Sequence, residues 1–491
     1  MKLLKKTHSL CPICLKTIEA DVYDDGEKVI IKKECPEHGD FEDIYWSDSD
    51  LYKRFLKYQI PGDPIDNPNT TREKGCPYDC GLCNEHKTHT MLGLIDVTNR
   101  CNFHCPICFA NAEAAGYVCE PTIEQIRVMM KLFREEEPVP TDNLMLAGGE
   151  PTVREDIIEI IKMAKTLGFK WILIATNGKR IAEDINFTMQ LKEAGMNIVY
   201  LQFDGLTPEV YEKTRGFNAW PLKQKAIENL KKVDIATTLV PTVIKGLNDD
   251  QVGDIIMYGV KNIEIVKSVN FQPVSFTGRI SKEGLKKKRY TIPDLIRDVE
   301  KQTDGQIKKE DWFPIPAIAP LEKLVEKMFD KRVMKSSTHV HCGAGLYAFE
   351  DKGELIPMSH FIDLDAVANI FKEEMKKPQD LHSIKVKLKI LARLIKTVDT
   401  ASAPSYFSWK EMFKAYLTSK EGYKAPKNVV RKAMFIGSMH FMDPYNFDTQ
   451  RVERCCIHYA TPDGRIIPFC AYNSIHRPNV EKKFAKPISN R

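Results

Sequence analysis

Short apolar runs alternate with longer amphipathic stretches between residues 91 and 274. Each run ends in polar or glycine residues, and the stretches between runs, such as 154–167 and 181–194, have the length and pattern of helices. Strands that alternate with helices of about ten to fifteen residues indicate βαβ units and a parallel sheet. We therefore predict an α/β fold whose six strands lie near residues 91–98, 143–148, 171–176, 197–204, 235–243 and 264–274.

Polar side chains follow several of the predicted strands at their carboxyl ends. In barrels of parallel strands the chemistry is concentrated at that end. These side chains are therefore candidate ligand contacts, although each residue type is also a common turn or cap former. The four candidates are Glu150, Asn177, Asp204 and Asn248.

Composition excludes several classes of protein. The chain has 491 residues, 43% hydrophobic and 28% charged, and its net charge of +5 is too small to indicate a nucleic-acid binder. No apolar run reaches the roughly eighteen residues that span a bilayer, and the first residues lack a signal-peptide core. We expect a cytoplasmic protein. Disulfides are rare in that compartment, so the fourteen cysteines point to metals.

Three cysteines just after the first predicted strand form a C-x3-C-x2-C triplet, Cys101, Cys105 and Cys108. Three thiolates can hold an iron–sulfur cubane of four irons, and one iron is then left without a protein ligand. An open metal position distinguishes a reactive site from a closed structural one. The alternative is a zinc loop or a structural iron–sulfur loop.

The triplet resembles the signature of the radical S-adenosylmethionine (SAM) superfamily, and Leu144–Pro151, with Gly148, Gly149 and Glu150, resembles that family's GGE segment. The resemblance implies a partial (β/α)6 TIM-like barrel with SAM bound to the open iron. It also implies that the GGE segment hydrogen-bonds the SAM amino group and that cleavage of SAM releases a 5′-deoxyadenosyl radical. Asn177 is a further candidate contact, Asp204 a candidate ribose contact and Asn248 a second one.

A second cysteine group lies at the N-terminus. Cys11, Cys14 and Cys35 stand on either side of a predicted hairpin, and His38 is the nearest fourth candidate. This spacing is typical of a small mononuclear metal ribbon. Zinc and a rubredoxin-like iron both suit it, and a loop of three buried thiols without metal is the alternative.

Two further cysteine groups indicate auxiliary clusters. Cys76, Cys80 and Cys83 repeat the triplet spacing in a linker, with Cys119 either their fourth ligand or a free thiol. Beyond the barrel, four thiols suffice for another cluster, although two adjacent cysteines rarely both ligate one cubane. These four are Cys342, Cys455, Cys456 and Cys470. We expect about three [4Fe-4S] clusters and one mononuclear iron or zinc.

The cysteine groups divide the chain into regions. Residues 281–337 are rich in Lys, Arg and Glu and contain three prolines, which favours an insertion. We predict an N-terminal mononuclear metal ribbon (1–60), an auxiliary-cluster linker (61–90), the radical SAM partial barrel (91–280), a charged insertion (281–337) and a C-terminal auxiliary iron–sulfur domain (338–491).

One predicted helix near residues 384–398 is basic and amphipathic. Its apolar side chains fall on one face and most of its Lys and Arg on the others. Such a helix can make peripheral contact with anionic lipid headgroups, or it can pack on protein with a solvated basic face. The apolar residues are Ile384, Leu388, Leu391, Ile395 and Val398.

The combination of metal motifs over nearly the whole chain resembles the archaeal tetraether lipid synthases, a family formerly assigned as radical SAM pterin methyltransferases. This resemblance implies carbon–carbon bond formation between terminal methyl carbons of isoprenoid chains of archaeal ether lipids. Two SAM molecules would be used for each bond, an auxiliary cluster would hold the first alkyl intermediate, and an external donor of the ferredoxin or flavodoxin type would supply electrons.

Two other functions compete with lipid synthesis. A radical SAM methyltransferase acting on a pterin would need a compact polar pocket instead of a long apolar one. A non-catalytic iron–sulfur scaffold or electron carrier is disfavoured, because such a protein has no use for the GGE segment.

Overall fold

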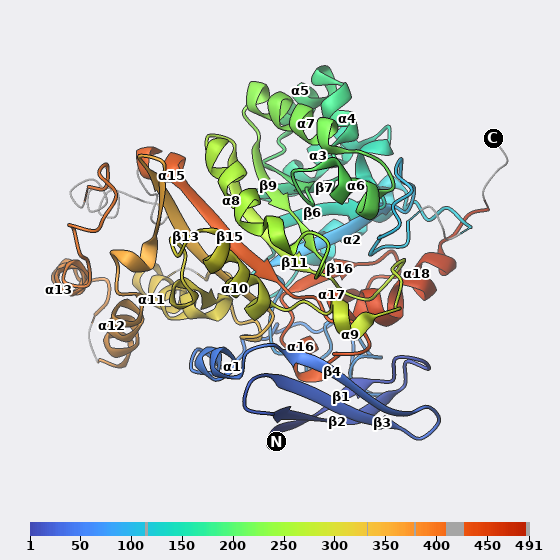
Figure 1. Ribbon diagram of the computed structural model, residues 1–491, viewed down its shortest axis with the longest axis horizontal. Coiled ribbons are helices and arrows are strands. Elements are labelled where there is room, and N and C mark those ends of the chain that lie inside the picture. Colours follow the sequence, from blue (N-terminus) through green and yellow to red (C-terminus); the bar gives the residue numbers. More distant parts are fainter. Residues whose placement is uncertain (113–115, 331, 378–379, 409–426, 488–491) are drawn as a thin grey trace.

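The computed structural model describes residues 1–112, 116–330, 332–377, 380–408 and 427–487. Figure 1 shows a small N-terminal sheet below a larger body that contains the parallel strands and their helices. The C-terminal segments return to both sides of these strands.

The N-terminal region is a four-stranded antiparallel sheet in chain order. Alternate residues of its strands are buried, and Trp46 packs edge-on against Phe55 of the helix that follows, with ring centroids 5.9 Å apart. Asp48 caps this helix by accepting from the backbone N–H of Leu51. The elements are β1 (Lys2–Leu10), β2 (Thr17–Asp24), β3 (Val29–Cys35), β4 (Gly39–Trp46) and α1 (Ser49–Leu56).

Six parallel strands form the centre of the large sheet, and each overlaps a predicted strand. Their order in space follows their order in the chain, as βαβ units require. One face of each strand is buried beneath helices, while the other faces the inside of the curved sheet. The strands are β5 (Leu92–Thr98), β6 (Asn143–Gly148), β7 (Trp171–Thr176), β8 (Ile198–Gln202), β9 (Ala236–Val240) and β11 (Val266–Pro273).

Amphipathic helices connect these strands. The first begins with a capping box in which Thr122 and Gln125 satisfy each other's backbone N–H groups. The helices are α2 (Ile123–Arg134), α3 (Ile157–Thr166), α4 (Lys179–Glu183), α5 (Ile185–Ala194), α6 (Pro208–Arg215), α7 (Trp220–Val233) and α8 (Val252–Lys261).

Strands from the C-terminal region extend both edges of the parallel sheet. The strand β15 pairs parallel with β11, and β16 pairs parallel with β5. No strand pairing within the described ranges closes the sheet into a barrel. The additional strands are β10 (Thr242–Val243), β12 (Phe313–Pro314), β13 (Gly343–Asp351), β14 (Glu354–Pro357), β15 (Ala433–Met439), β16 (Ile457–Ala460) and β17 (Ile466–Pro468).

Part of the segment 281–337, predicted as a charged insertion, packs into the core. Tyr290 and Trp312 are fully buried in the main core. Arg289, also fully buried, forms ion pairs with Asp43 of the N-terminal sheet and with Asp443, whose Oδ2 lies 2.7 Å from Nη1. This region therefore joins the N- and C-terminal segments. Its helices are α9 (Leu285–Lys288), α10 (Ile292–Gln302) and α11 (Ala319–Phe329).

The basic amphipathic helix exists, but its buried face is not the predicted one. Ile390 is buried, whereas Ile384 is 66% exposed and Leu388 and Ile395 are each 45% exposed. In the described part of the chain, every helix is too short or too polar to cross a bilayer. The remaining helices are α12 (Leu364–Lys376), α13 (Ile384–Ile395), α15 (Lys427–Lys432), α16 (Thr449–Val452), α17 (Phe469–Ala471) and α18 (Arg477–Lys483).

Candidate active site in the barrel

The cysteine triplet lies in the loop between β5 and α2. This loop is fastened to the segment after β11, because Cys108 and Arg279 exchange two backbone hydrogen bonds of 2.9 and 2.8 Å. Gly278 has a φ of +63°, and a Cβ added there would lie 2.3 Å from the carbonyl oxygen of Phe109. A glycine is required for this close approach.

A cavity of about 290 Å³, which we call the barrel cavity, lies at the carboxyl ends of the parallel strands. The structure brings together seven of the residues predicted from sequence, since all of them line this cavity. They are Cys101, Cys105, Cys108, Gly148, Gly149, Glu150 and Asn177. Three thiols at one end of a cavity with open space beside them fit a cubane that has one iron left for another ligand.

Glu150 is held rigidly at the end of β6. Glu150 is only 1% exposed. Oε1 accepts from the hydroxyl of Thr176 at 2.7 Å, and Oε2 accepts from the backbone N–H of Asn177 at 2.7 Å. The Asn177 amide in turn donates to Oδ1 of Asn102 in the cysteine loop, also at 2.7 Å. These bonds tie the ends of β6 and β7 to the loop.

The two glycines before Glu150 make room for protein backbone. A Cβ on Gly148 would lie 2.1 Å from the carbonyl oxygen of Thr98, and one on Gly149 would lie 2.3 Å from that of Arg100. These glycines therefore admit the residues that lead into the cysteine loop.

Asp204 and Asn248, predicted as ribose contacts, are held by protein partners. Asp204 is fully buried and forms a bidentate ion pair with Arg215 at 2.6 and 2.8 Å. The Asn248 amide donates to the carbonyls of Asp204 and Thr242 and accepts from the N–H of Ile244. Neither side chain lines the barrel cavity. Their role as ribose contacts stays a prediction, and no sequence motif indicated the bonds that the structure shows.

Arg215 is a site residue that the sequence did not indicate. It lines the cavity, donates to the carbonyl of Ile107 at 3.1 Å and interacts with the sulfur of Cys105. Asp204 fixes its orientation. In sequence Arg215 lies at the end of α6 and looks like an ordinary surface residue before a glycine cap.

Burial raises the pKa of two thiols of the triplet, Cys101 and Cys105. Burial, together with the nearby Glu150 carboxylate and the other thiols, raises the pKa of Cys101 to about 12. Because the ligand form is the thiolate, binding of iron must displace the protons of these thiols.

The N-terminal site has the geometry of a single metal ion. Ligand atoms of Cys11, Cys14, Cys35 and His38 all lie within 4.8 Å of one another, the one such group in the described chain. Nδ1 of His38 lies 3.6 Å from the Cys11 sulfur and 3.4 Å from that of Cys35. Three sulfurs and one imidazole suit tetrahedral zinc.

The second triplet lies apart from the barrel cavity. Cys76, Cys80 and Cys83 line a small hollow of their own. The hydrogen bond with Cys76 and burial are the main causes that raise the pKa of Cys80.

Cys119, predicted either as the fourth ligand of this triplet or as a free thiol, lies at the base of the cysteine loop near β5. Its N–H donates to the Asn99 side chain, and burial together with the charges of Glu481 and Asp96 raises the pKa of its thiol. Its role as a fourth ligand stays a prediction.

The other three C-terminal cysteines all interact electrostatically with Cys342. Burial is the chief cause that raises the pKa of Cys455, Cys456 and Cys470, and the charge of Cys342 adds to the rise in each. The Cys470 sulfur also accepts from the N–H of Met442, and the Cys456 thiol is hydrogen-bonded to Thr338.

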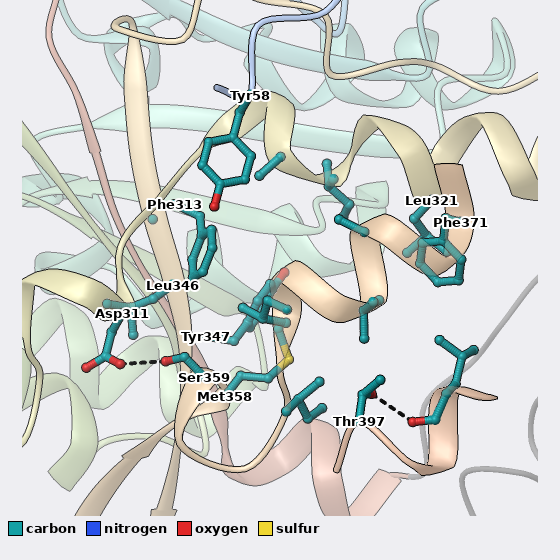
Figure 2. A pocket seen from close by; sticks show the side chains of 18 of the residues that line it. Tyr58, Asp311, Phe313, Leu321, Leu346, Tyr347, Met358, Ser359, Phe371 and Thr397 are labelled. Carbon is teal, nitrogen blue, oxygen red and sulfur yellow. Dashed lines mark hydrogen bonds between the residues drawn. The ribbon is translucent and has the colours of Figure 1, made fainter. Parts of the chain in front are cut away.

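A second and larger cavity of about 570 Å³ lies away from the strand ends, and we call it the lateral cavity. Figure 2 shows its walls, which include Phe313, Leu346 and Phe371. Polar groups in these walls are bound to the protein: Ser359 donates to Asp311 at 2.6 Å, and Thr397 donates to the carbonyl of Leu394 at 2.7 Å.

Comparison with known proteins identifies relatives over the barrel and over the full length. Residues 95–258 match the Radical SAM superfamily model, and residues 3–47 match the HMPTM N-terminal zinc ribbon domain. A 7,8-dihydro-6-hydroxymethylpterin dimethyltransferase of Methanocaldococcus jannaschii is 50% identical over 489 residues, 99% of this chain and 96% of the relative.

More distant similarities cover less than half of this chain. A probable GTP 3′,8-cyclase of Thermococcus kodakarensis is 32% identical over 36% of this chain and 56% of its own. The crystal structure of Streptococcus suis SuiB bound to precursor peptide SuiA has 18% identity, a TM-score of 0.35 and coverage of 45% of this chain and 46% of that one.

The expectation of a tetraether lipid synthase is wrong, because the full-length relative is a pterin dimethyltransferase. The expected ether lipid partner and the expected joining of isoprenoid chains are wrong for the same reason. The substrate was predicted wrongly because the metal motifs determine the cofactors and carry no information about the substrate. The chain belongs to the radical SAM superfamily and, within it, to the family of the Methanocaldococcus jannaschii 7,8-dihydro-6-hydroxymethylpterin dimethyltransferase.

Proposed function

We propose that this protein is a radical SAM methyltransferase that acts on a dihydropterin of the 7,8-dihydro-6-hydroxymethylpterin type. The observation that carries the proposal is the 50% identity with such an enzyme over 99% of this chain. The compact barrel cavity, with polar groups at the strand ends, supports it.

Membership of the superfamily implies a [4Fe-4S] cluster and SAM. When bound, the cluster supplies the electron that cleaves the SAM sulfonium. We assign Cys101, Cys105 and Cys108 as its ligands. Glu150 and Asn177 are held by short hydrogen bonds beside these thiols, so they can bind and orient the amino group of SAM. Arg215, fixed by Asp204, provides a positive charge next to Cys105.

The other metal sites are assigned to support roles. Cys11, Cys14, Cys35 and His38 hold zinc, in agreement with the zinc ribbon match. One auxiliary cluster is held by Cys76, Cys80 and Cys83.

A second auxiliary cluster is held by Cys342 and Cys470, with Cys455 close to both groups. These clusters are suited to electron transfer from an external donor of the ferredoxin or flavodoxin type.

A labelled methyl group tests the proposal. Anaerobically reconstituted protein is given SAM with a deuterated methyl group, a strong reductant and 7,8-dihydro-6-hydroxymethylpterin, and the pterin is analysed by mass spectrometry. We expect products heavier by one or two methyl groups and 5′-deoxyadenosine that depends on the triplet. Unchanged pterin from protein that still forms 5′-deoxyadenosine would refute the pterin assignment.

A further inference from the structure

We propose that Tyr200 and Gln272 recognise the hydrogen-bonding edge of the pterin ring, with Asn270 as a residue that positions Tyr200. This inference rests on the proposed function and names the part of the barrel cavity that selects the substrate. Tyr200 and Gln272 line that cavity, on β8 and β11.

These side chains form a polar wall inside the curved sheet. Tyr200, Asn270 and Gln272 occupy the inward-facing, partly exposed positions of their strands, while the alternate residues Val199, Leu201 and Phe271 are fully buried beneath the helices.

The hydrogen bonds of the wall leave both donors and acceptors available. The amides of Asn270 and Gln272 both donate to the Tyr200 hydroxyl oxygen, the latter at 3.3 Å. The phenolic hydrogen is therefore directed elsewhere, and neither amide oxygen accepts from any described residue. Burial raises the pKa of Tyr200 to about 12, so the hydroxyl keeps its proton and can donate.

Other polar side chains in the same half of the cavity are already engaged. The Gln202 amide donates to Asp204 at 2.6 Å and accepts from Lys223 at 2.6 Å. Arg477 forms ion pairs with Asp96 at 2.6 Å and with Glu481 at 3.2 Å. Two further lining residues, Thr277 and Arg279, each have a buried side-chain atom without a described partner. On the strands β8 and β11, the groups that remain available to a ligand are those of Tyr200 and Gln272.

Other walls of this half are aromatic and apolar. Phe441 and Phe469 stack with ring centroids 3.9 Å apart, and Phe109 stacks on Phe469 at 5.3 Å. Leu94 and Met145 lie on β5 and β6 and also line the cavity. A flat ring system with polar groups on its edge matches such a site, because its faces pack on aromatic rings while its edge bonds to the polar wall. A pterin has this shape and carries both donors and acceptors on its pyrimidine edge.

Substitutions that preserve shape can test this recognition. Tyr200→Phe removes one hydroxyl, and Gln272→Leu removes one amide. Ser268→Ala is the matched control, since Ser268 lies on the same face of β11 but is paired with the Thr238 hydroxyl and does not line the cavity. The measurement is the Kd of 7,8-dihydro-6-hydroxymethylpterin for the full, reconstituted chain, with the Kd of SAM as a check on folding.

We expect Tyr200→Phe and Gln272→Leu each to raise the pterin Kd about tenfold, the effect of losing one hydrogen bond, and to leave the SAM Kd unchanged. They should also reduce discrimination against lumazine, in which oxygen replaces the 2-amino group. Ser268→Ala should bind like the wild type.

Two contrary results are distinguishable. If the wild type binds and methylates the pterin while both variants keep its Kd and its preference over lumazine, this inference is overturned and the proposed function stands. If the wild type itself neither binds nor methylates the pterin, the proposed function fails as well. Gln272→Glu, which retains size and one acceptor, replaces Gln272→Leu if the latter loses SAM binding.

Discussion

The two cavities differ in what their walls can do. The lateral cavity is about twice as large, at about 570 Å³ against 290 Å³, but Ser359 and Thr397 in its walls are bound to protein partners and most of its lining side chains are apolar. The smaller barrel cavity contains three thiols, a fixed carboxylate and the polar wall of Tyr200 and Gln272. The reactive groups that converge on a cavity, and not the volume of the cavity, therefore identify the active site.

The difference follows from topology. The barrel cavity lies where the carboxyl ends of six parallel strands meet, so loops from distant parts of the chain bring polar side chains together. The lateral cavity lies between β13 and the helices α11, α12 and α13, whose inward faces are apolar because they form a packed core.

Removal of the triplet should abolish the chemistry of the barrel cavity. Replacement of Cys101, Cys105 and Cys108 by Ala removes all protein ligands of the cluster, so reductive formation of 5′-deoxyadenosine should fall to background. The measurement is 5′-deoxyadenosine by liquid chromatography. Residual formation at the wild-type rate would mean that another cysteine group cleaves SAM.

Removal of the second triplet should separate SAM cleavage from product formation. With Cys76, Cys80 and Cys83 replaced by Ala, the protein should lose about four irons per chain, retain 5′-deoxyadenosine formation and make no methylated pterin. Iron analysis and product analysis on the same sample test this. Unchanged iron content would show that Cys76, Cys80 and Cys83 hold no cluster.

Filling each cavity with a larger side chain tests which of the two cavities serves the reaction. Ala147 lines the barrel cavity and Ala368 the lateral one. Ala147→Leu should lower kcat/KM for the pterin about a hundredfold, because misplacement of a reactant by about 1 Å has that effect. Ala368→Leu should leave it within about twofold. Equal losses from both would show that the lateral cavity also serves the reaction.

A smaller effect is expected from a buried carboxyl group near the start of β5. Burial raises the pKa of Glu136 to about 7, although Thr90 and Thr141 donate hydrogen bonds to it. A raised pKa stabilises the fold below the ordinary value near 4.5, and this contribution is lost as the pH rises through about 7.

Compared with Glu136→Gln, the wild type should therefore lose up to about 3 kcal/mol of stability between pH 4.5 and 7.5. Thermal unfolding of the two proteins at both pH values measures this. A constant difference would contradict the raised pKa. Activity at pH 7 should be similar in the two proteins, since Glu136 lies outside both cavities.

Local patterns in the sequence were sufficient for the barrel and for its cysteine loop. Each of the six strands is a short apolar run before a polar turn, and Cys101, Cys105 and Cys108 are contiguous enough to be recognised without tertiary contacts. The same holds for Cys11, Cys14, Cys35 and His38, which the fold brings within reach of one ion.

Features that depend on distant contacts could not be predicted. No motif indicated the ion pair of Asp204 with Arg215 or the hydrogen bond from the Cys119 N–H to the Asn99 side chain. The strands β15 and β16, which pair with the two outer strands of the parallel sheet, come from a region expected to form a separate domain. The prediction of the substrate was wrong for a related reason, since Tyr200 and Gln272, the residues that we propose recognise it, belong to no motif.

The central claim is that the pterin binds in the barrel cavity and not in the lateral one. An anaerobic crystal structure with SAM and 7,8-dihydro-6-hydroxymethylpterin tests it most directly. We expect density for a flat bicyclic ring in the barrel cavity, with its edge at Tyr200 and Gln272 and its face near Phe441 and Phe469. A pterin found in the lateral cavity, or a barrel cavity that holds SAM and excludes the pterin at saturating concentration, would contradict the account.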